Sequence, residues 1–373
     1  MAKINRFSGN LQAFASAALG TERTIFGGVT QSDDLTSQIT ASFLRGWGIV
    51  GPSDSPSLED FNAAMYTHGQ LLAYLHQVGV PEYNAAQEYH QGSISNLGGD
   101  LYVSLINSNV GNAPATSPSS WRSTSASSST VGESRNLRAA LGAAATSISF
   151  TADEIIVKRA IGGQSWTISS VSNILNVATV GAGGMDTGAA PVSGYVAIYA
   201  IYNPTTGAKA LLGQNATASA APSVYVGANM PAGYVGSALI SVWPTNGSQQ
   251  LVIGMQSGRD IGIANNVVLT TSTQQASLTS LSISGAVPRN AVSVRGDFTI
   301  GTSIAGEGCG GVISGSAVEV GRCAIGATSP TANATVVGSF PDINLFSQQT
   351  VYYRATTSGG TLNFLITIAG YSI

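Results

Sequence analysis

Residues 350–368 read TVYYRATTSGGTLNFLITI. Two segments rich in β-branched and aromatic residues, Thr350–Thr356 and Leu362–Ile368, flank the turn signal SGG at 358–360. This composition is typical of strands, and a short glycine-containing break between two strands is typical of a β-hairpin. The stretch therefore predicts two antiparallel strands that pair with each other.

The same strand-and-turn pattern recurs along the chain from residue 146 to the end. Tyr195–Tyr202 runs into the turn sequence NPTTG, and Ala238–Trp243 is followed by PTNG and by a returning strand at Gln250–Met255. About a dozen such strands without intervening helix signals are typical of an antiparallel sandwich. We predict a mainly β protein whose C-terminal domain, 146–373, is an antiparallel, jelly-roll-like β-sandwich.

A helix is the clearest element of the first 80 residues. Ser57 is a suitable N-cap, and Gly79 with Pro81 beyond it is a stop signal, so the helix is expected to run from about Ser57 to Val78. We predict that residues 1–80 form a small α+β domain around this helix.

One face of the expected helix carries a heptad pattern. Its members are separated by alternating steps of three and four residues: Leu58, Phe61, Met65, His68, Leu72 and Leu75. Such spacing is typical of the a and d positions of a coiled coil. The face either packs on its own domain or meets the same helix in other copies. We adopt the second interpretation as our prediction, a homotrimer held partly by this face.

Two shorter segments separate the expected domains. Residues 81–122 are rich in turn signals and are predicted to form a small β module with a strand at Asp100–Asn107. Residues 123–145 are predicted to be a linker, because STSASSSTVGES at 123–134 is of low complexity, followed by a short helix over Arg135–Leu141 that stops at Gly142.

Charge and hydropathy exclude several classes of protein. The 373 residues include 15 basic and 18 acidic side chains, so the chain lacks the basic footprint of a nucleic-acid-binding protein. No run of about 18 apolar residues predicts a transmembrane helix. Residues 163–258 contain only Asp186 and Lys209 as charged residues. A surface this neutral favours association between copies or a ligand with little charge.

The sequence offers no catalytic or metal-binding constellation. All three histidines lie at or before residue 90, far in sequence from the two cysteines, Cys309 and Cys323. A cysteine nucleophile needs a nearby base, and a histidine metal site needs converging side chains. We therefore predict no catalytic residue, no metal and no cofactor, and leave open whether the cysteines pair.

Candidate ligand-binding residues lie beside the expected turns of the β domain. They combine aromatic faces with amide groups: Tyr202, Asn203, Tyr225, Trp243 and Asn246. Neutral saccharides are bound by stacking under the sugar ring and by amide or hydroxyl hydrogen bonds. The sequence thus predicts a neutral glycan ligand for this domain.

Part of the chain resembles a known module. YNAAQEY at 83–89, followed by YVSLINSNVGNAP at 102–114 and Trp121, resembles the aromatic–Asn–Gly–Pro–Trp module of tailed-bacteriophage tail fibres, which is itself similar to small chitin-binding modules. Ser104, Leu105 and Ile106 stand where chitin binders place sugar-stacking aromatics. GYVAIY at 194–199 and the closing GYSI are similar to terminal β domains of phage tail proteins.

The resemblance implies a virion tail fibre or receptor-binding protein, usually a homotrimer, made in the host cytoplasm and located in the phage tail. Its N-terminal region would attach to other tail-tip or baseplate proteins, and its β domain would recognise a glycan or protein receptor on the bacterial surface. Two alternatives remain open: a tail depolymerase that hydrolyses host surface polysaccharide, and a cellular lectin-like adhesin.

Overall fold

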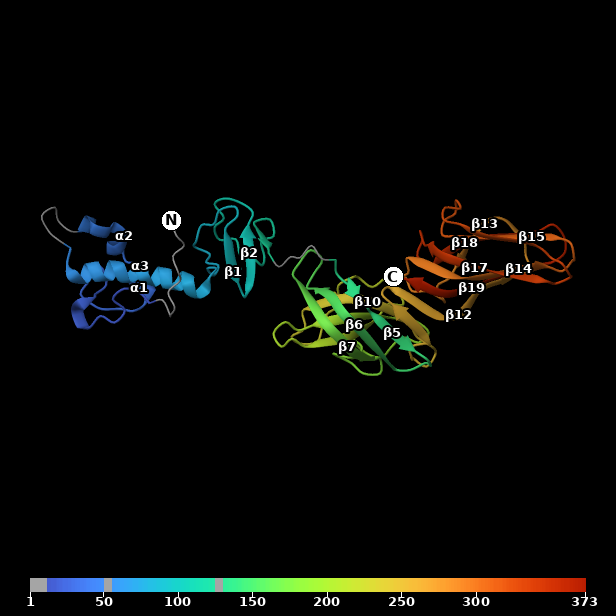
Figure 1. Ribbon diagram of the computed structural model, residues 1–373, viewed down its shortest axis with the longest axis horizontal. Helices are drawn as coiled ribbons and strands as arrows, with labels where there is room; N and C mark the ends of the chain where they lie inside the picture. Colours follow the sequence, from blue (N-terminus) through green and yellow to red (C-terminus); the bar gives the residue numbers. More distant parts are fainter. Residues whose placement is uncertain (1–11, 50–55, 125–129) are drawn as a thin grey trace, which may run out of the picture. The chain divides into compact units, whose positions relative to one another are not determined.

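A computed structural model describes residues 12–49, 56–124 and 130–373. The chain divides into two compact units, residues 1–124 and 125–373 (Figure 1). The division falls within the stretch expected to be a linker, of which residues 125–129 lie outside the described part, as do 1–11 and 50–55 of the expected N-terminal domain.

The N-terminal unit begins with helical segments. In chain order, those within residues 12–49 and 56–124 are η1 (Gly20–Glu22), α1 (Leu35–Gln38), α2 (Ala41–Arg45), η2 (Gly46–Ile49) and α3 (Leu58–Val78). The prediction for α3 is confirmed at both ends. The Ser57 side chain accepts a hydrogen bond from the Asp60 amide, and Gly79, at a positive φ of 69°, donates its amide to the Leu75 carbonyl.

One face of α3 packs against the chain that precedes it. Ala63, Tyr66, Thr67 and Ala73 are buried, and they recur at the spacing of a single helical face. The guanidinium of Arg23 lies 3.5 Å from the centre of the Tyr66 ring and also pairs with Asp33. The packed face is therefore the one opposite the heptad residues.

The small β module follows α3. It is a three-stranded antiparallel sheet of β1 (Ile94–Leu97), β2 (Asp100–Ser104) and β3 (Trp121–Ser123) within the described residues of this unit. The Trp121 ring packs edge-on against Tyr89, with 5.0 Å between ring centres, and its Nε1 donates to the Asn112 carbonyl at 2.8 Å. The aromatic, asparagine and tryptophan positions of the module thus form its own small core.

Strands make up most of the C-terminal unit. They are β4 (Ser134–Arg135), β5 (Arg138–Leu141), β6 (Ser147–Lys158), β7 (Ser165–Asn176), β8 (Tyr195–Tyr202), β9 (Lys209–Asn215), β10 (Gly236–Pro244), β11 (Gly254–Ser257), β12 (Asp260–Thr271), β13 (Gln275–Ser282), β14 (Ser293–Thr302), β15 (Gly308–Ser314), β16 (Cys323–Thr328), β17 (Thr335–Asn344), β18 (Thr350–Thr357) and β19 (Leu362–Ser372).

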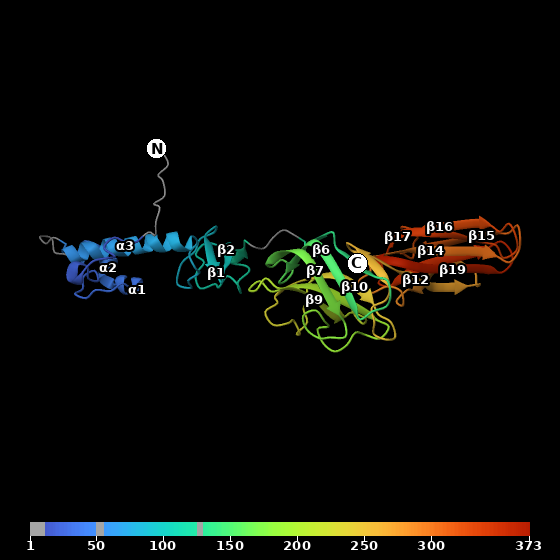
Figure 2. The same ribbon diagram turned by 60° about the horizontal axis from the view of Figure 1, so that its bottom comes forward.

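These strands form two antiparallel sheets within residues 130–373 (Figures 1 and 2). The larger has twelve strands along the order β17-β14-β19-β12-β11-β5-β6-β10-β8-β9, with β4 and β7 also paired to β6. The smaller has the order β13-β18-β15-β16. The prediction of a mainly β protein built from large antiparallel sheets is confirmed.

The expected hairpin at residues 350–368 is wrong in its pairing. Both strands form, but β18 pairs with β13 and β15, whereas β19 pairs with β12 and β14. The SGG turn therefore carries the chain from one sheet to the other. The same is true of every link between successive strands from β12 to β19 except the β15–β16 hairpin.

Two further sequence predictions are corrected by burial and pairing. The helix expected at Arg135–Leu141 is instead β4 and β5, because Leu137 and Ala139 alternate inward and β5 pairs with β6 and β11. The strand expected at Gln250–Met255 returns on β10 only briefly, through an antiparallel bridge between Leu251 and Thr245 and the Val252 amide donating to the Pro244 carbonyl. The regular strand β11 starts at Gly254 and pairs with β5 and β12.

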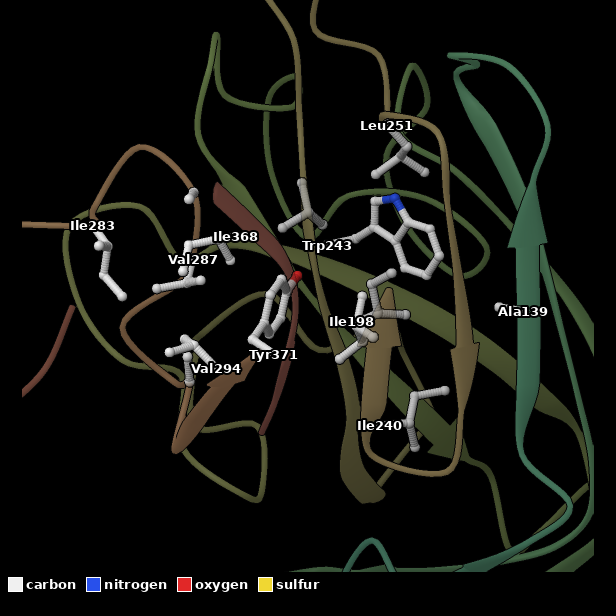
Figure 3. Close-up of a cluster of buried hydrophobic side chains, with 14 of the residues drawn as sticks. Ala139, Ile198, Ile240, Trp243, Leu251, Ile283, Val287, Val294, Ile368 and Tyr371 are labelled. Carbon is white, nitrogen blue, oxygen red and sulfur yellow. The ribbon is translucent and has the colours of Figure 1, made fainter. Parts of the chain in front are cut away.

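The core of the C-terminal unit joins residues distant in sequence. Figure 3 shows Tyr371 between Trp243 and Ile198 on one side and Val294 and Val287 on the other. The Tyr371 hydroxyl donates to the Val242 carbonyl at 2.7 Å, which connects the last strand to β10. Cys309 belongs to this core and Cys323 packs against it, and both are free thiols.

Candidate functional site

The predicted ligand residues do not converge on one site. Tyr202 pairs with Gly236 and Tyr195 pairs with Pro244, so Tyr202 and Trp243 lie toward opposite ends of the β8–β10 pair. Seven residue steps of about 3.4 Å separate the two ends of β8, roughly 24 Å in all. A single small ligand cannot contact the Asn203 turn at one end and the Asn246 turn at the other.

Trp243 is a core residue. Its side chain is fully buried, its ring packs edge-on against Phe150 with 6.3 Å between centres, and its Nε1 donates to the Val252 carbonyl at 2.9 Å. Figure 3 shows the indole ring between Leu251 and Ile198. The assignment of Trp243 to a ligand surface is therefore corrected: its ring offers no face for a sugar to stack on.

Tyr225 is also packed inside the protein. Only 6% of it is exposed, and its ring lies edge-on to Tyr199. Its hydroxyl donates to Asp186 Oδ2 at 3.0 Å and accepts from the Asn229 amide at 3.3 Å. Burial, together with the Asp186 carboxylate, raises the pKa of Tyr225 to about 12. The side chain holds a loop in place rather than presenting an aromatic surface.

The two predicted asparagines stabilise turns. The Asn203 side-chain oxygen accepts from the Thr205 and Thr206 amides, at 3.0 and 3.2 Å. The Asn246 oxygen accepts from the Ser248 and Gln250 amides, at 2.9 and 3.0 Å. Side-chain oxygens bonded to their own following backbone are typical of asparagine in turns.

Tyr202 keeps a partly accessible ring. It is half-buried, and it leans on Trp166, which is also half-buried, with 6.0 Å between the ring centres. Of the predicted ligand residues, Tyr202 is the one whose aromatic surface reaches solvent.

The C-terminal unit contains a cavity that the sequence did not indicate. Its volume is about 480 Å³. Its walls come from the start of β8, the end of β10, the middle of β12 and the chain after β13, and none of the lining residues is charged: Ser193, Gly194, Tyr195, Pro244, Thr245, Val252, Ile253, Ile263, Ala264, Asn265, Asn266, Val267, Ser284, Gly285 and Ala286.

An irregularity in β12 shapes this charge-free cavity. The pairing of β12 with β19 shifts between Gly262 and Asn266, so residues 263–265 leave the regular ladder. Asn265 is exposed there. The Asn266 side chain donates its Nδ2 to the Gly285 carbonyl at 3.2 Å, and the Tyr195 hydroxyl donates to the Ser284 carbonyl at 2.9 Å. These two bonds fix the wall opposite β12.

The cavity offers amide, hydroxyl and apolar groups without charge, which suits an uncharged polar ligand. The sequence feature that could have pointed to this cavity is the pair Asn265-Asn266, two side-chain amides within a segment that otherwise has the pattern of a strand. It could not be interpreted from sequence, because the register shift that exposes Asn265 depends on pairing with β19, about 100 residues later.

The heptad face of α3 is solvent-exposed in the N-terminal unit. Its aliphatic and aromatic members are between 43% and 67% exposed, and His68 is exposed as well. Within the described residues the fully buried residues of α3 lie on the opposite face, and His68 of the heptad face packs its ring against Phe43 of the same domain, with 5.8 Å between the ring centres.

In the part of the chain that the structure describes, no group of three or more His, Cys, Asp or Glu side chains is placed to hold a metal ion. Within the same residues, no helix has the length and apolar character to cross a membrane.

Comparisons with known proteins leave the family open. No family model matches the chain, and no curated protein matches it. Among solved structures, a Bacillus thuringiensis Cry1Da tryptic core variant is 10% identical, with a TM-score of 0.17, over 85% of this chain and 63% of that one. The VP2 subviral particle of infectious bursal disease virus is 10% identical, with a TM-score of 0.19, over 81% and 77%. The Gt strain of that virus is 12% identical, with a TM-score of 0.19, over 65% and 67%.

Proposed function

We propose that this chain is a non-enzymatic, trimeric adhesive protein of a phage tail. Its N-terminal unit would attach to other tail-tip or baseplate proteins, and its C-terminal unit would recognise the bacterial surface. The observation that carries the proposal is the two-faced helix α3, with Tyr66 and Ala63 packed on one side and Phe61, Met65 and Leu72 exposed on the other.

An exposed heptad face is stabilised by burial against the same face of other copies. Each large apolar side chain that becomes fully buried contributes about 1.5–3 kcal/mol. Leu58, Phe61, Met65, Leu72 and Leu75 recur at a/d spacing, which is the pattern that fits knobs into holes between parallel helices. A copy of this chain is thus the partner whose surface matches the face best.

We further propose that β12–β19 are a jelly roll. Eight strands alternate between the sheets β17-β14-β19-β12 and β13-β18-β15-β16. Double-sheet jelly rolls are one way in which all-β domains manage their sheet edges, and they recur in viral capsid and lectin domains. This supports a rigid surface domain that presents the residues of its loops and faces to a receptor.

We assign the receptor contact to the charge-free cavity, and the ligand bound there to a neutral glycan. A test compares binding of the purified full chain to neutral host-surface glycans with that of three variants. Val267→Arg places a charge in the cavity and Asn265→Ala removes an exposed amide, so both should weaken binding about ten-fold or more. Val226→Arg is the matched control, because Val226 is 78% exposed and does not line the cavity. Unchanged binding by Val267→Arg and Asn265→Ala would move the receptor contact to another surface.

The depolymerase alternative has one specific observation in its favour. Asp260 pairs with Nη1 of Arg295, and Asp342 Oδ1 lies 3.8 Å from the same nitrogen, so two carboxylates are close together. Glycoside hydrolysis uses two carboxyl groups about 5–10 Å apart. Release of reducing ends from host polysaccharide, abolished by both Asp260→Asn and Asp342→Asn, would establish the enzyme. Our proposal expects no release.

A further inference from the structure

A second cavity lies over the large sheet and shares no lining residue with the charge-free cavity. Its volume is about 510 Å³, and it extends over strands β6, β5, β11, β12 and β14. The lining residues are Arg138, Ala139, Ala140, Ser149, Thr151, Met255, Gln256, Ser257, Asp260, Gly262 and Arg295. We call this the arginine groove.

Gly262 lines the groove, and Gly370 of the neighbouring strand β19 lies directly beneath Arg295. Gly370 of β19 is paired on one side with Arg295 and on the other with Gly262. A Cβ built on Gly370 would lie 2.7 Å from both Cζ and Nη2 of Arg295, and one on Gly262 would lie 3.8 Å from Nη2. The guanidinium of Arg295 therefore lies over the backbone of β19, in space that a Cβ at position 370 would occupy.

Carboxylates hold Arg295 in that position. Asp260 pairs with its Nη1, and Asp342 lies 3.8 Å from the same atom. Asp260 is half exposed and borders the groove, so its carboxylate also remains accessible to a ligand. Asp260 and Arg295 therefore place a hydrogen-bond acceptor and fixed hydrogen-bond donors next to each other at one end of the groove.

Arg138 stands toward the other end. It is exposed, and no ion pair within residues 130–373 engages it. It is paired in register with Ser257 on one side and Thr151 on the other, so hydroxyl groups flank it. Between the two arginines, Met255 is 67% exposed and presents an apolar surface.

These groups together define a ligand chemistry. The exposed guanidinium of Arg138 can bind a ligand carboxylate. The Asp260 carboxylate and the neighbouring Arg295 guanidinium can accept from and donate to ligand hydroxyl groups. The Met255 thioether can pack against the apolar face of a ring. We propose that the arginine groove binds a sugar acid, with the ligand carboxylate on Arg138, its hydroxyls on Asp260 and Arg295, and its ring over Met255. This site is distinct from the neutral-glycan cavity and does not depend on the receptor role proposed above.

The test measures binding of the full chain by calorimetry to a tetrasaccharide of alternating glucuronate and N-acetylglucosamine. The carboxyl-reduced form of the same tetrasaccharide is the ligand control. We expect Arg138→Gln to weaken binding of the acidic form about ten-fold or more, because a charge-assisted bond is lost. Met255→Glu should weaken it similarly by placing a like charge against the carboxylate. Arg135→Gln is the matched control, since Arg135 is exposed on β4 and does not line the groove.

Three results would overturn the proposal: no saturable binding at millimolar tetrasaccharide, equal affinity for the carboxyl-reduced form, or unchanged affinity in both Arg138→Gln and Met255→Glu. Each variant is checked for an unchanged melting temperature. Asn265→Ala should leave this affinity unchanged, so a failure here and a failure of the neutral-glycan assignment are separate results.

Discussion

The rings of Tyr353 and Phe364 stack with their centres 6.1 Å apart and their planes 23° from parallel. Tyr353 belongs to β18 of the smaller sheet and Phe364 to β19 of the larger one. Strands that were expected to lie edge to edge therefore face each other across the core. Their side chains, and not their backbones, make the contact between them.

Phe364→Ala should destabilise the C-terminal unit by about 3–5 kcal/mol, because Phe364 is fully buried and its removal leaves a cavity. Denaturant unfolding followed by tryptophan fluorescence measures this. Phe346→Ala is the matched control, since Phe346 is 68% exposed, and it should cost far less. Similar losses for the two variants would mean that Phe364 does not belong to the core.

Local sequence patterns predicted where helices and strands lie better than they predicted which strands pair with each other. The α3 boundaries follow from Ser57 and Gly79, whose effects act within one helical turn. Strand pairing at residues 350–368 was missed because a glycine turn permits either a hairpin or a crossover. The choice depends on which sheet buries Tyr353 and Phe364, and that is decided by strands far away in sequence.

The prediction that Trp243 contacts a ligand was wrong for a related reason. An aromatic ring beside a turn has the same sequence whether it faces solvent or the core. Trp243 is buried because Phe150 and the Val252 carbonyl meet it from distant parts of the chain. Arg295 reaches the arginine groove in the same way, because its register with Gly370 of β19 is encoded by no local pattern.

Tyr371→Phe should lower the free energy of unfolding by about 1–3 kcal/mol. The variant keeps the ring but leaves the buried Val242 carbonyl without its hydroxyl donor. Thermal and denaturant unfolding check the value, with Tyr352→Phe as the control because Tyr352 is only half-buried. A Tyr371→Phe variant as stable as the parent would mean that this hydrogen bond contributes nothing to the link between β19 and β10.

Alkaline pH should destabilise the C-terminal unit above pH 10. Burial raises the pKa of Tyr225 to about 12, and burial likewise raises the pKa values of Tyr195, Tyr199 and Tyr371. A tyrosine whose pKa is higher in the folded state stabilises the fold below pH 10, and this contribution is lost as the pH rises toward 12. Tyrosinate absorbance should therefore show that these four buried tyrosines ionise only as the protein unfolds. A single ionisation near pH 10 with the fold intact would contradict this.

Residues 130–373 should fold when expressed alone. This unit has its own core, and the division from the N-terminal unit falls at residues 124 and 125. We expect the fragment to show β-type circular dichroism and a cooperative thermal transition. Limited proteolysis of the full chain should release a similar fragment by cutting within 123–134. An aggregated or unfolded fragment would show that the C-terminal unit requires the residues before it.

The central claim is that α3 assembles three copies through its exposed heptad face, and the mass in solution tests it most directly. Multi-angle light scattering of the full chain at micromolar concentration should give about three times the chain mass of 37.8 kDa. Leu72→Asp should shift the mass to that of a folded monomer, because it places a charge at the centre of a buried seam, whereas Leu71→Asp, on the flank of the same helix, should affect assembly much less. A stable monomer of 37.8 kDa for the parent chain, or a trimer that Leu72→Asp leaves intact, would contradict the account.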